Sequence, residues 1–243
     1  MGNSSNENPL YTDYLDTHFG HFKDVSIDGI ENSIPALDHY YGELLPVENT
    51  SLILDIGCGF GNFVHYLNKK GYKNVVGVDV SPQQVETAES LGIPNVKCAE
   101  AGEFLSSKVS FYDCIIAIDL LDHLPKDDVV EFIQLMYASL KPGGRLIIQV
   151  VNGQSPFSGR LRYGDFTHQF ALTSSSAGQL MRIAGFSKFQ FYDTSPYPHG
   201  VKSFIRWLGW QVVKFGLWSI TVMETGNTKG NILTQNLIIL AEK

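Results

Sequence analysis

The chain has 243 residues, enough for one α/β domain with a well-filled core, and its 44% hydrophobic and 18% charged residues are typical of globular proteins. Its formal net charge is −7 and the sequence contains no lysine and arginine cluster, which argues against nucleic acid as a partner because binding phosphates needs a basic face. Three scattered cysteines predict reduced thiols, with neither a disulfide framework nor a zinc site.

The N-terminal part is polar over residues 1–9, which predicts a disordered lead without a signal peptide. Residues 11–45 are rich in Tyr, Phe and His, and residues 34–41 predict a short helix with Pro35 in its first turn. No apolar run reaches the ~20 residues of a membrane-spanning helix. We therefore expect a cytoplasmic protein.

The motif around which the chain is organised follows at residues 51–63. An apolar strand over 51–56 contains Asp55 and runs into Gly57, Gly59 and Gly61, and a helix is expected over 61–70. Such glycines let the backbone bend sharply and approach a ligand, with helix N-terminal amides facing it. Nicotinamide-binding folds use a similar loop. An acid before the first glycine suits a cationic ligand better than a pyrophosphate.

The rest of the chain alternates strands and helices. A strand over 74–78 ends at Asp79, 24 residues after Asp55, and Ser81 and Pro82 begin a helix that runs to Leu91. The other expected elements are strands 95–98, 112–118, 145–151, 188–192 and 232–241, helices 126–139, 173–185 and 200–218, and a long connection over 152–172. The run over 112–118 is apolar enough to be buried on both faces, as in a parallel sheet.

Four segments occur in the order of one known family. They are the loop at Asp55, residues 76–81, residues 113–119 and residues 140–144. With them the chain resembles a class I S-adenosylmethionine-dependent methyltransferase. The resemblance implies a doubly wound α/β fold with a seven-stranded, mostly parallel Rossmann-like sheet and an antiparallel last strand. It implies an N-terminal lead and lid over 1–48, for which an ordinary packing helix is the alternative, and a methyltransferase domain over 49–243 with an apolar helical insertion at 200–230.

The resemblance also implies which residues bind S-adenosylmethionine. Asp79 would bind the ribose hydroxyls, Glu100 the adenine amino group, and the backbone amide of Ala101 an adenine ring nitrogen. Phe60 would pack against the cofactor or belong to the core. The complete expected set is Asp55, Gly57, Cys58, Gly59, Gly61, Asp79, Val80, Glu100, Ala101 and Asp119.

Methyl transfer to a hydroxyl group gains from a base that takes the proton as the bond forms. His168, in the connection over 152–172, is the first candidate, with Asp165 orienting its ring, and His123 is the second. A magnesium site on Asp119, Asp122, His123, Asp165 and His168 is the alternative, but the end of strand 145–151 carries no acid. We therefore expect no metal.

The acceptor is less defined by the sequence. Residues 167–186 resemble ubiquinone-type small-molecule O-methyltransferases and, more closely, methyltransferases of bacterial surface-polysaccharide biosynthesis. The resemblance implies a sugar or glycan precursor as acceptor, with N- or C-methylation of another small molecule and a catalytically silent cofactor-binding protein as alternatives.

The helix expected over 200–218 is apolar nearly all round, with Lys202, Arg206, Gln211 and Lys214 as exceptions. A helix of this kind is not stable as an isolated element in water. Packing on its own domain is the default expectation, and a homodimer face or a peripheral membrane contact near a lipid-linked glycan are the alternatives.

Overall fold

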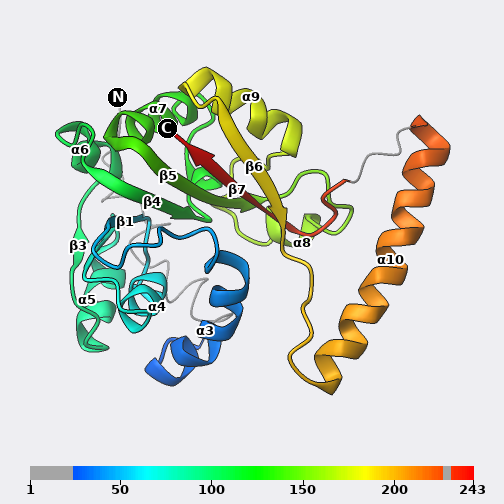
Figure 1. Ribbon diagram of the computed structural model, residues 1–243, viewed down its shortest axis with the longest axis horizontal. Helices are drawn as coiled ribbons and strands as arrows, with labels where there is room; N and C mark the ends of the chain where they lie inside the picture. Colours follow the sequence, from blue (N-terminus) through cyan, green and yellow to red (C-terminus); the bar gives the residue numbers. More distant parts are fainter. Residues whose placement is uncertain (1–23, 227–230) are drawn as a thin grey trace.

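The computed structural model describes residues 24–226 and 231–243, and its centre is one seven-stranded sheet. The strands are β1 (Leu52–Ile56), β2 (Asn74–Asp79), β3 (Val96–Cys98), β4 (Tyr112–Ile118), β5 (Leu140–Val151), β6 (Lys188–Asp193) and β7 (Asn236–Glu242). Their order is β3-β2-β1-β4-β5-β7-β6. The first five are parallel, and β7 is antiparallel to both β5 and β6 (Figure 1). The expected fold class is confirmed.

Helices cover both faces of this sheet (Figure 1). One layer contains α3 (Ile27–Tyr41), α4 (Asn62–Lys69) and α5 (Pro82–Ser90), and the other contains α6 (Ala101–Ser106), α7 (Val129–Ser139) and α9 (Ser174–Ala184). Alternate residues of β4 enter the two cores, Cys114 and Ile116 on the α4 side and Ile115 and Ala117 on the α7 side. The order of the strands reverses between β1 and β4, which is where sheets of this type bind their ligands.

The helix before β1 is longer than the sequence predicts. It begins at Ile27, where Ser26 caps it by accepting a hydrogen bond from Gly29 N, so Pro35 lies inside the helix and the expected start at residue 34 is wrong. Ile30 and Tyr41 are buried in the α4-side core. Burial of this apolar side outweighs the lost backbone hydrogen bond at proline.

Several other elements differ from expectation, among them β7, which begins at Asn236 rather than at residue 232. Strand β5 begins at Leu140 rather than at residue 145, because Leu140 pairs with Tyr112 across a register shift in β4. Helix α6 was not expected, and α7 begins at Val129 rather than at 126. The expected cap of α9 is confirmed, since Thr173 accepts from Ser176 N in a capping box.

The apolar insertion forms α10 (Val201–Thr225), which extends beyond the expected end at residue 218. It lies beside the domain and not within it (Figure 1). Ser203 is its single buried residue, so the default expectation of intramolecular packing is wrong for most of its surface. Among residues 24–226 and 231–243, no helix combines the length and hydropathy that a membrane span requires.

Candidate active site

The glycine loop between β1 and α4 is folded back tightly against β2. Gly57 N and Cys58 N both donate to the carbonyl of Val78, at 2.8 and 3.1 Å. Gly57, Gly59 and Gly61 have φ values of 70°, 56° and 85°, a region that residues with a Cβ rarely adopt. A Cβ on Gly57 would also lie 2.8 Å from Leu120 Cδ1. The loop thus keeps its backbone close to the carboxyl ends of β1, β2 and β4.

Asp79, at the end of β2, closes on this loop. Its Oδ2 accepts from Gly59 N at 2.8 Å and its Oδ1 from Ser81 N at 2.9 Å. Burial raises the pKa of the Asp79 carboxyl against the lowering effect of these backbone bonds. Each carboxylate oxygen has a further lone pair, so both can accept a ligand hydroxyl. This is the position at which the sequence predicts ribose binding.

Asp55 is a buried acid with an unsatisfied oxygen. Its side chain is 2% exposed, and Oδ2 has no hydrogen-bond partner within the described part of the chain. Burial and the neighbouring Asp79 raise the pKa of the Asp55 carboxyl to about 8. A cationic group of a ligand is the natural partner for such an oxygen, because it lowers the cost of ionising a buried acid. The loop therefore fits S-adenosylmethionine, the cofactor that the sequence resemblance implies.

The two residues expected at the adenine lie at the start of α6. Glu100 caps this helix, with Oε1 accepting from Gly102 N at 3.0 Å and Oε2 from Glu103 N at 2.6 Å. Ala101 is the first residue of the helix, where a backbone N–H has no intrahelical acceptor. The capping role of Glu100 was not anticipated, and the second lone pair on each oxygen leaves adenine binding compatible with it.

The remaining expected cofactor residues occupy the same edge of the sheet. Val80 follows Asp79 directly, and its carbonyl accepts from Cys98 Sγ at 3.7 Å. Cys58 is partly buried, and burial raises the pKa of its thiol well above the usual value. Phe60 is 3% exposed and belongs to the core on the α4 side, which was one of its two expected roles.

Asp119 lies at the tip of β4 and is held by a buried hydrogen-bonded chain. Its φ of 53° is unusual for a residue with a side chain. Asp119 Oδ1 accepts from Gln149 Nε2 at 2.8 Å, and Gln149 Oε1 accepts from Tyr41 Oη at 2.6 Å. The last residue of α3 is therefore connected through β5 to the end of β4. The sequence gives no periodic or motif signal for this chain, since its members come from three distant segments.

His123, in the 3₁₀ turn η3 (Leu121–His123), is oriented by a second chain. The hydroxyl of Thr167 donates to Asp165 Oδ1 at 2.6 Å, and His123 Nδ1 lies 2.7 Å from the same hydroxyl oxygen. A hydroxyl has one hydrogen, so Nδ1 is the donor to Thr167. Asp165 and Thr167 are buried, which fixes this arrangement. In the neutral ring of His123, Nε2 is therefore the nitrogen without a hydrogen.

His168 belongs to a different pair. Its Nδ1 donates to the carbonyl of Leu161 at 2.9 Å, and its Nε2 lies 3.7 Å from Oδ2 of Asp122, a fully buried acid. Burial raises the pKa of Asp122 to about 6, and Asp119 acts in the same direction while His168 opposes it. The rings of His123 and His168 meet edge to face with centroids 4.6 Å apart.

This arrangement corrects one expected pairing. The sequence pairs Asp165 with His168, three residues apart, whereas the structure places the Asp165 carboxylate on Thr167 and Asp122 beside His168. A turn explains the difference, because Asp165 Oδ1 also accepts from Thr167 N and so caps its own loop. Both expected histidines are brought together, and Thr167 is the residue that sequence reasoning missed.

Asp122, His123 and His168 also have the composition of a metal site. One ligand atom from each residue lies within 4.8 Å of the others. Asp122 Oδ1 has no hydrogen-bond partner within the described residues. Two histidines and one carboxylate are ligands for a transition metal rather than for magnesium.

A family model described as "Methyltransferase domain" matches residues 35–191 of this chain. A 2-methyl-6-phytyl-1,4-hydroquinone methyltransferase of Synechocystis is 33% identical over 140 residues, covering 54% of this chain and 43% of the relative. An 18S rRNA (guanine(1575)-N(7))-methyltransferase of Saccharomyces cerevisiae is 30% identical over 117 residues, covering 44% and 42%. The chain thus spans less than half the length of these curated relatives.

Solved structures show the same fold. A SAM-dependent methyltransferase from Archaeoglobus fulgidus has a TM-score of 0.67 at 20% identity, covering 88% of this chain and 94% of that one. A Haemonchus contortus phosphoethanolamine N-methyltransferase 2, in complex with phosphomonomethylethanolamine and S-adenosylhomocysteine, has a TM-score of 0.63 at 17% identity, covering 99% of this chain and 60% of that one.

Proposed function

The chain belongs to the methyltransferase domain family, and from this premise we propose that it transfers a methyl group from S-adenosylmethionine to a hydroxyl group of a small molecule, with a sugar or glycan precursor as the favoured class. The observation that carries the choice of a hydroxyl is the oriented His123, held by Thr167 and Asp165 beyond the end of β4. An alcohol has a high pKa, so its methylation gains from a nearby base. An amine can react without one.

The cofactor-binding role falls to residues at the ends of β1, β2 and β4. Asp79 would accept from the ribose hydroxyls, and Asp55 would neutralise a cationic group of the cofactor through its unpartnered Oδ2. When bound, S-adenosylmethionine supplies an electrophilic methyl group on a sulfonium. The glycine loop lets the backbone approach it closely. Holding donor and acceptor in line supplies ~7–11 kcal/mol in well-oriented cases.

We assign the base to His123. His123 Nε2 would take the hydroxyl proton as the acceptor oxygen gains the methyl group that S-adenosylmethionine supplies, with the electron pair of the broken carbon–sulfur bond remaining on sulfur. Thr167 and Asp165 then stabilise the imidazolium through Nδ1–H, as the third member does in other base–orienter arrangements. A positioned base of this kind contributes ~10²–10⁴-fold.

His168, the first candidate from the sequence, supports this site in another way. Its Nδ1 donates to the carbonyl of Leu161 and its Nε2 lies 3.7 Å from the buried Asp122 carboxylate, so both ring nitrogens face protein groups. His168 instead fixes the loop after α8 (Gly159–Arg162) over η3, together with Arg162, which donates to the His168 carbonyl.

The acceptor class rests on charge and on resemblance. Relatives in this family methylate substrates as different as a hydroquinone and 18S rRNA, to judge from their names, so family membership alone leaves the acceptor open. The net charge of −7 favours a small molecule or glycan over nucleic acid. N- or C-methylation of another small molecule is the second candidate, for which the base would matter little.

The reaction we propose uses no metal, although Asp122, His123 and His168 have suitable donor atoms. Displacement at a sulfonium methyl needs no Lewis acid, because the leaving sulfur becomes neutral. Turnover after dialysis against EDTA should therefore stay within about twofold of its starting value, against the ~10²–10⁴-fold that the base contributes. Excess Zn²⁺ should inhibit by occupying His123. Loss of turnover on EDTA treatment, restored by one added metal, would contradict this assignment.

Product analysis tests the proposal as a whole. The purified chain is incubated with methyl-labelled cofactor and a panel of nucleotide sugars, glycan precursors, phenols, amines and RNA, with Gly57→Leu as the control that should not bind the cofactor. We expect one label on an oxygen atom of a sugar or glycan acceptor. Label on nitrogen or carbon would establish the second candidate. Label on added RNA would contradict the small-molecule assignment.

A further inference from the structure

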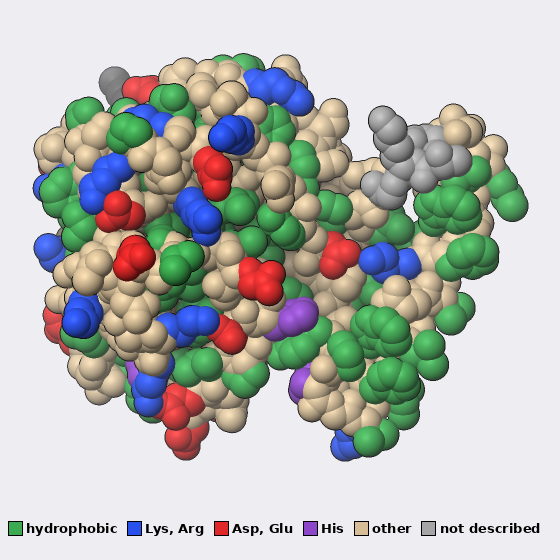
Figure 2. Space-filling view, in the orientation of Figure 1, with side chains coloured by type: hydrophobic (Ala, Val, Ile, Leu, Met, Phe, Trp, Pro, Cys, Tyr) green, Lys and Arg blue, Asp and Glu red, His purple; other side chains and the backbone are tan. Residues whose placement is uncertain are grey.

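Helix α10 presents a long apolar face that nothing in the described chain covers. Ten of the seventeen exposed large hydrophobic side chains among the described residues lie on this helix. We define its outer face by apolar residues that are each at least half exposed: Val201, Ile205, Leu208, Val212, Phe215 and Met223, the first five of which recur every three or four positions. Figure 2 shows hydrophobic side chains gathered along the side of α10 that points away from the domain. Contiguous apolar surface of this kind marks an interaction site.

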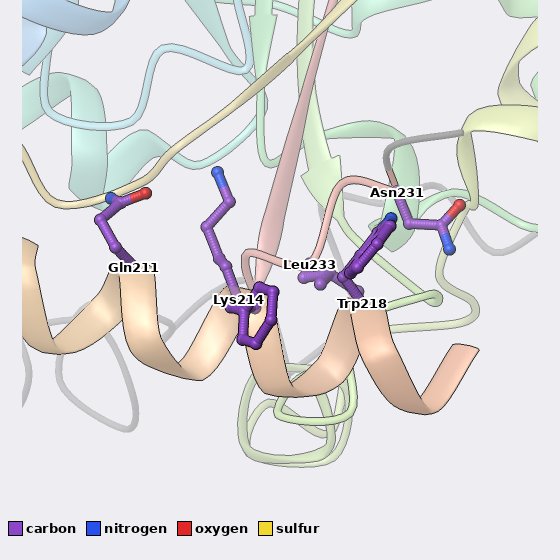
Figure 3. Close-up of a pocket in the computed structure, with 6 residues that line it drawn as sticks. Gln211, Lys214, Trp218, Asn231 and Leu233 are labelled. Carbon is purple, nitrogen blue, oxygen red and sulfur yellow. The ribbon is translucent and has the colours of Figure 1, made fainter. Parts of the chain in front are cut away.

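The opposite side of α10 is fixed to the domain by polar contacts. Trp210 Nε1 donates to Ser195 Oγ at 2.9 Å, and Lys214 Nζ lies 3.1 Å from Asp193 Oδ2. Between this side and the domain is a cavity of about 300 Å³, lined in part by Gln211, Lys214 and Trp218 (Figure 3). The inner side of the helix therefore combines these polar contacts with partly buried aromatic side chains, Trp207 and Trp210. This anchoring leaves the outer face available.

Charges at the two ends of α10 indicate what covers the outer face. Lys202 and Arg206 lie in the first two turns and Glu224 in the last turn, and all three are exposed. These signs are opposite to those that the helix dipole favours at each end. Between residues 207 and 223 the one charged side chain is Lys214, which points inward to Asp193. The outer face therefore has an uncharged middle, with basic side chains near one end of the helix and an acidic side chain near the other.

We propose that the outer face of α10 is a self-association surface on which the α10 helix of a second copy docks antiparallel. In this orientation Lys202 and Arg206 of one copy face Glu224 of the other, and a twofold axis repeats the contact. Each charged end also lies beside the terminus of the partner helix that has the opposite partial charge. Gly209 and Gly216 lie on the same side, with open space where a Cβ would be, and allow the two backbones to approach near the axis.

A lipid surface is the rival occupant, and the charges oppose it. Helices that lie in a membrane interface carry lysine and arginine along their polar face and are attracted to anionic lipids. Here basic residues lie near one end of the helix only, Glu224 lies near the other end, and the chain carries a net charge of −7, which anionic lipid would repel. The opposite charges at the two ends suit a second copy in the antiparallel orientation.

Sedimentation equilibrium of the full-length protein tests the surface itself. We expect a dimer, and Val212→Glu should weaken it by at least about 100-fold because two charges would be buried near the axis. Val47→Glu is the matched control, since Val47 is 88% exposed on the domain and the same change there should leave the dimer unaffected. Cofactor binding by calorimetry reports that each variant is folded.

Charge exchange tests the antiparallel orientation. Lys202→Glu combined with Arg206→Glu, and separately Glu224→Lys, should each weaken the dimer by about tenfold, because each places like charges together twice. Mixing these two variants should restore a heterodimer of wild-type affinity. A parallel pair would show no such loss. In that orientation each charged residue lies opposite the same residue of the second copy, so like charges meet in the wild type and in both variants.

Three outcomes overturn the proposal. A wild-type protein that stays monomeric at high micromolar concentration excludes self-association. Flotation of that monomer with phosphatidylcholine vesicles, abolished by Val212→Glu, assigns the face to lipid. A dimer that tolerates Val212→Glu, or whose affinity is unchanged in both charge variants, excludes this surface or this orientation.

Discussion

Replacement of His123 by alanine should lower kcat by ~10²–10⁴-fold while leaving cofactor affinity within about threefold of wild type. The base acts only as the acceptor oxygen forms its new bond, so its loss affects the transition state and not the binding of the cofactor. Steady-state kinetics and calorimetry with S-adenosylmethionine separate the two effects.

Variants along the orienting chain give a graded control for His123→Ala. Thr167→Val keeps the size of the side chain but removes the hydroxyl that links His123 to Asp165, and we expect a smaller loss of kcat than for His123→Ala. His168→Ala should cost less still in kcat. A loss below about tenfold in His123→Ala would show that proximity carries the reaction. An amine or carbon acceptor would then be the better assignment.

Asp55→Asn should weaken cofactor binding by about 10–100-fold, the effect of removing one charge-assisted contact in a buried site. Below the pKa of about 8 the Asp55 carboxyl is largely protonated without ligand, and a bound cation would favour its ionised form. Binding to the wild type should therefore release a proton near pH 7, and binding to the variant should not. Calorimetry in buffers of different ionisation enthalpy measures this difference.

Asp55→Asn should weaken cofactor binding but stabilise the ligand-free protein. Because the pKa of Asp55 is raised in the folded state, its contribution is fully present below the unfolded value of ~3.9 and is lost as the pH rises through about 8. Ligand-free Asp55→Asn should therefore melt at a higher temperature than wild type at pH 9, with the difference disappearing near pH 4. A lower melting temperature at pH 9 would contradict the buried, unpartnered carboxylate.

Asp113 provides a matched acid outside the site. Hydrogen bonds from Lys141 and from Leu52 N lower its pKa despite the opposing effect of burial. Asp113→Asn should accordingly destabilise the protein at neutral pH, and the loss should fade as the pH falls through the lowered pKa. Opposite signs of the stability change for Asp55, which is buried, and Asp113, which is partly exposed on the neighbouring strand, separate the electrostatic effect from a general effect of the substitution.

The fold was predictable because its signals are local and repeated. Apolar runs that end in Asp55 or Asp79, followed by glycine or a capping serine, define strand-to-helix turns without knowledge of distant contacts. The start of α3 was missed because Pro35 is a strong local signal, whereas the burial of Ile30 against α4-side residues is a tertiary effect. Helix α6 was missed because it has only six residues and begins at a glutamate cap.

The sequence predicts where the candidate site residues lie in the fold, but not which side chains contact one another. The glycine loop and Asp79 follow from spacing, since the carboxyl ends of neighbouring parallel strands must meet. The partners of His123 and His168 do not follow, because Thr167 reaches His123 across 44 residues and Tyr41 reaches Gln149 across 108. Long-range hydrogen bonds of single side chains leave no periodic pattern, so proximity in sequence wrongly suggested Asp165 as the partner of His168.

The pH dependence of kcat in wild type, His123→Ala and His168→Ala tests the central claim most directly. A base must be unprotonated to accept the hydroxyl proton, so wild-type turnover should fall on the acidic side. We expect this acidic limb to disappear in His123→Ala, leaving a low and pH-independent rate, and to persist in His168→Ala. An acidic limb that persists in His123→Ala and disappears in His168→Ala would contradict the assignment of His123 as the base.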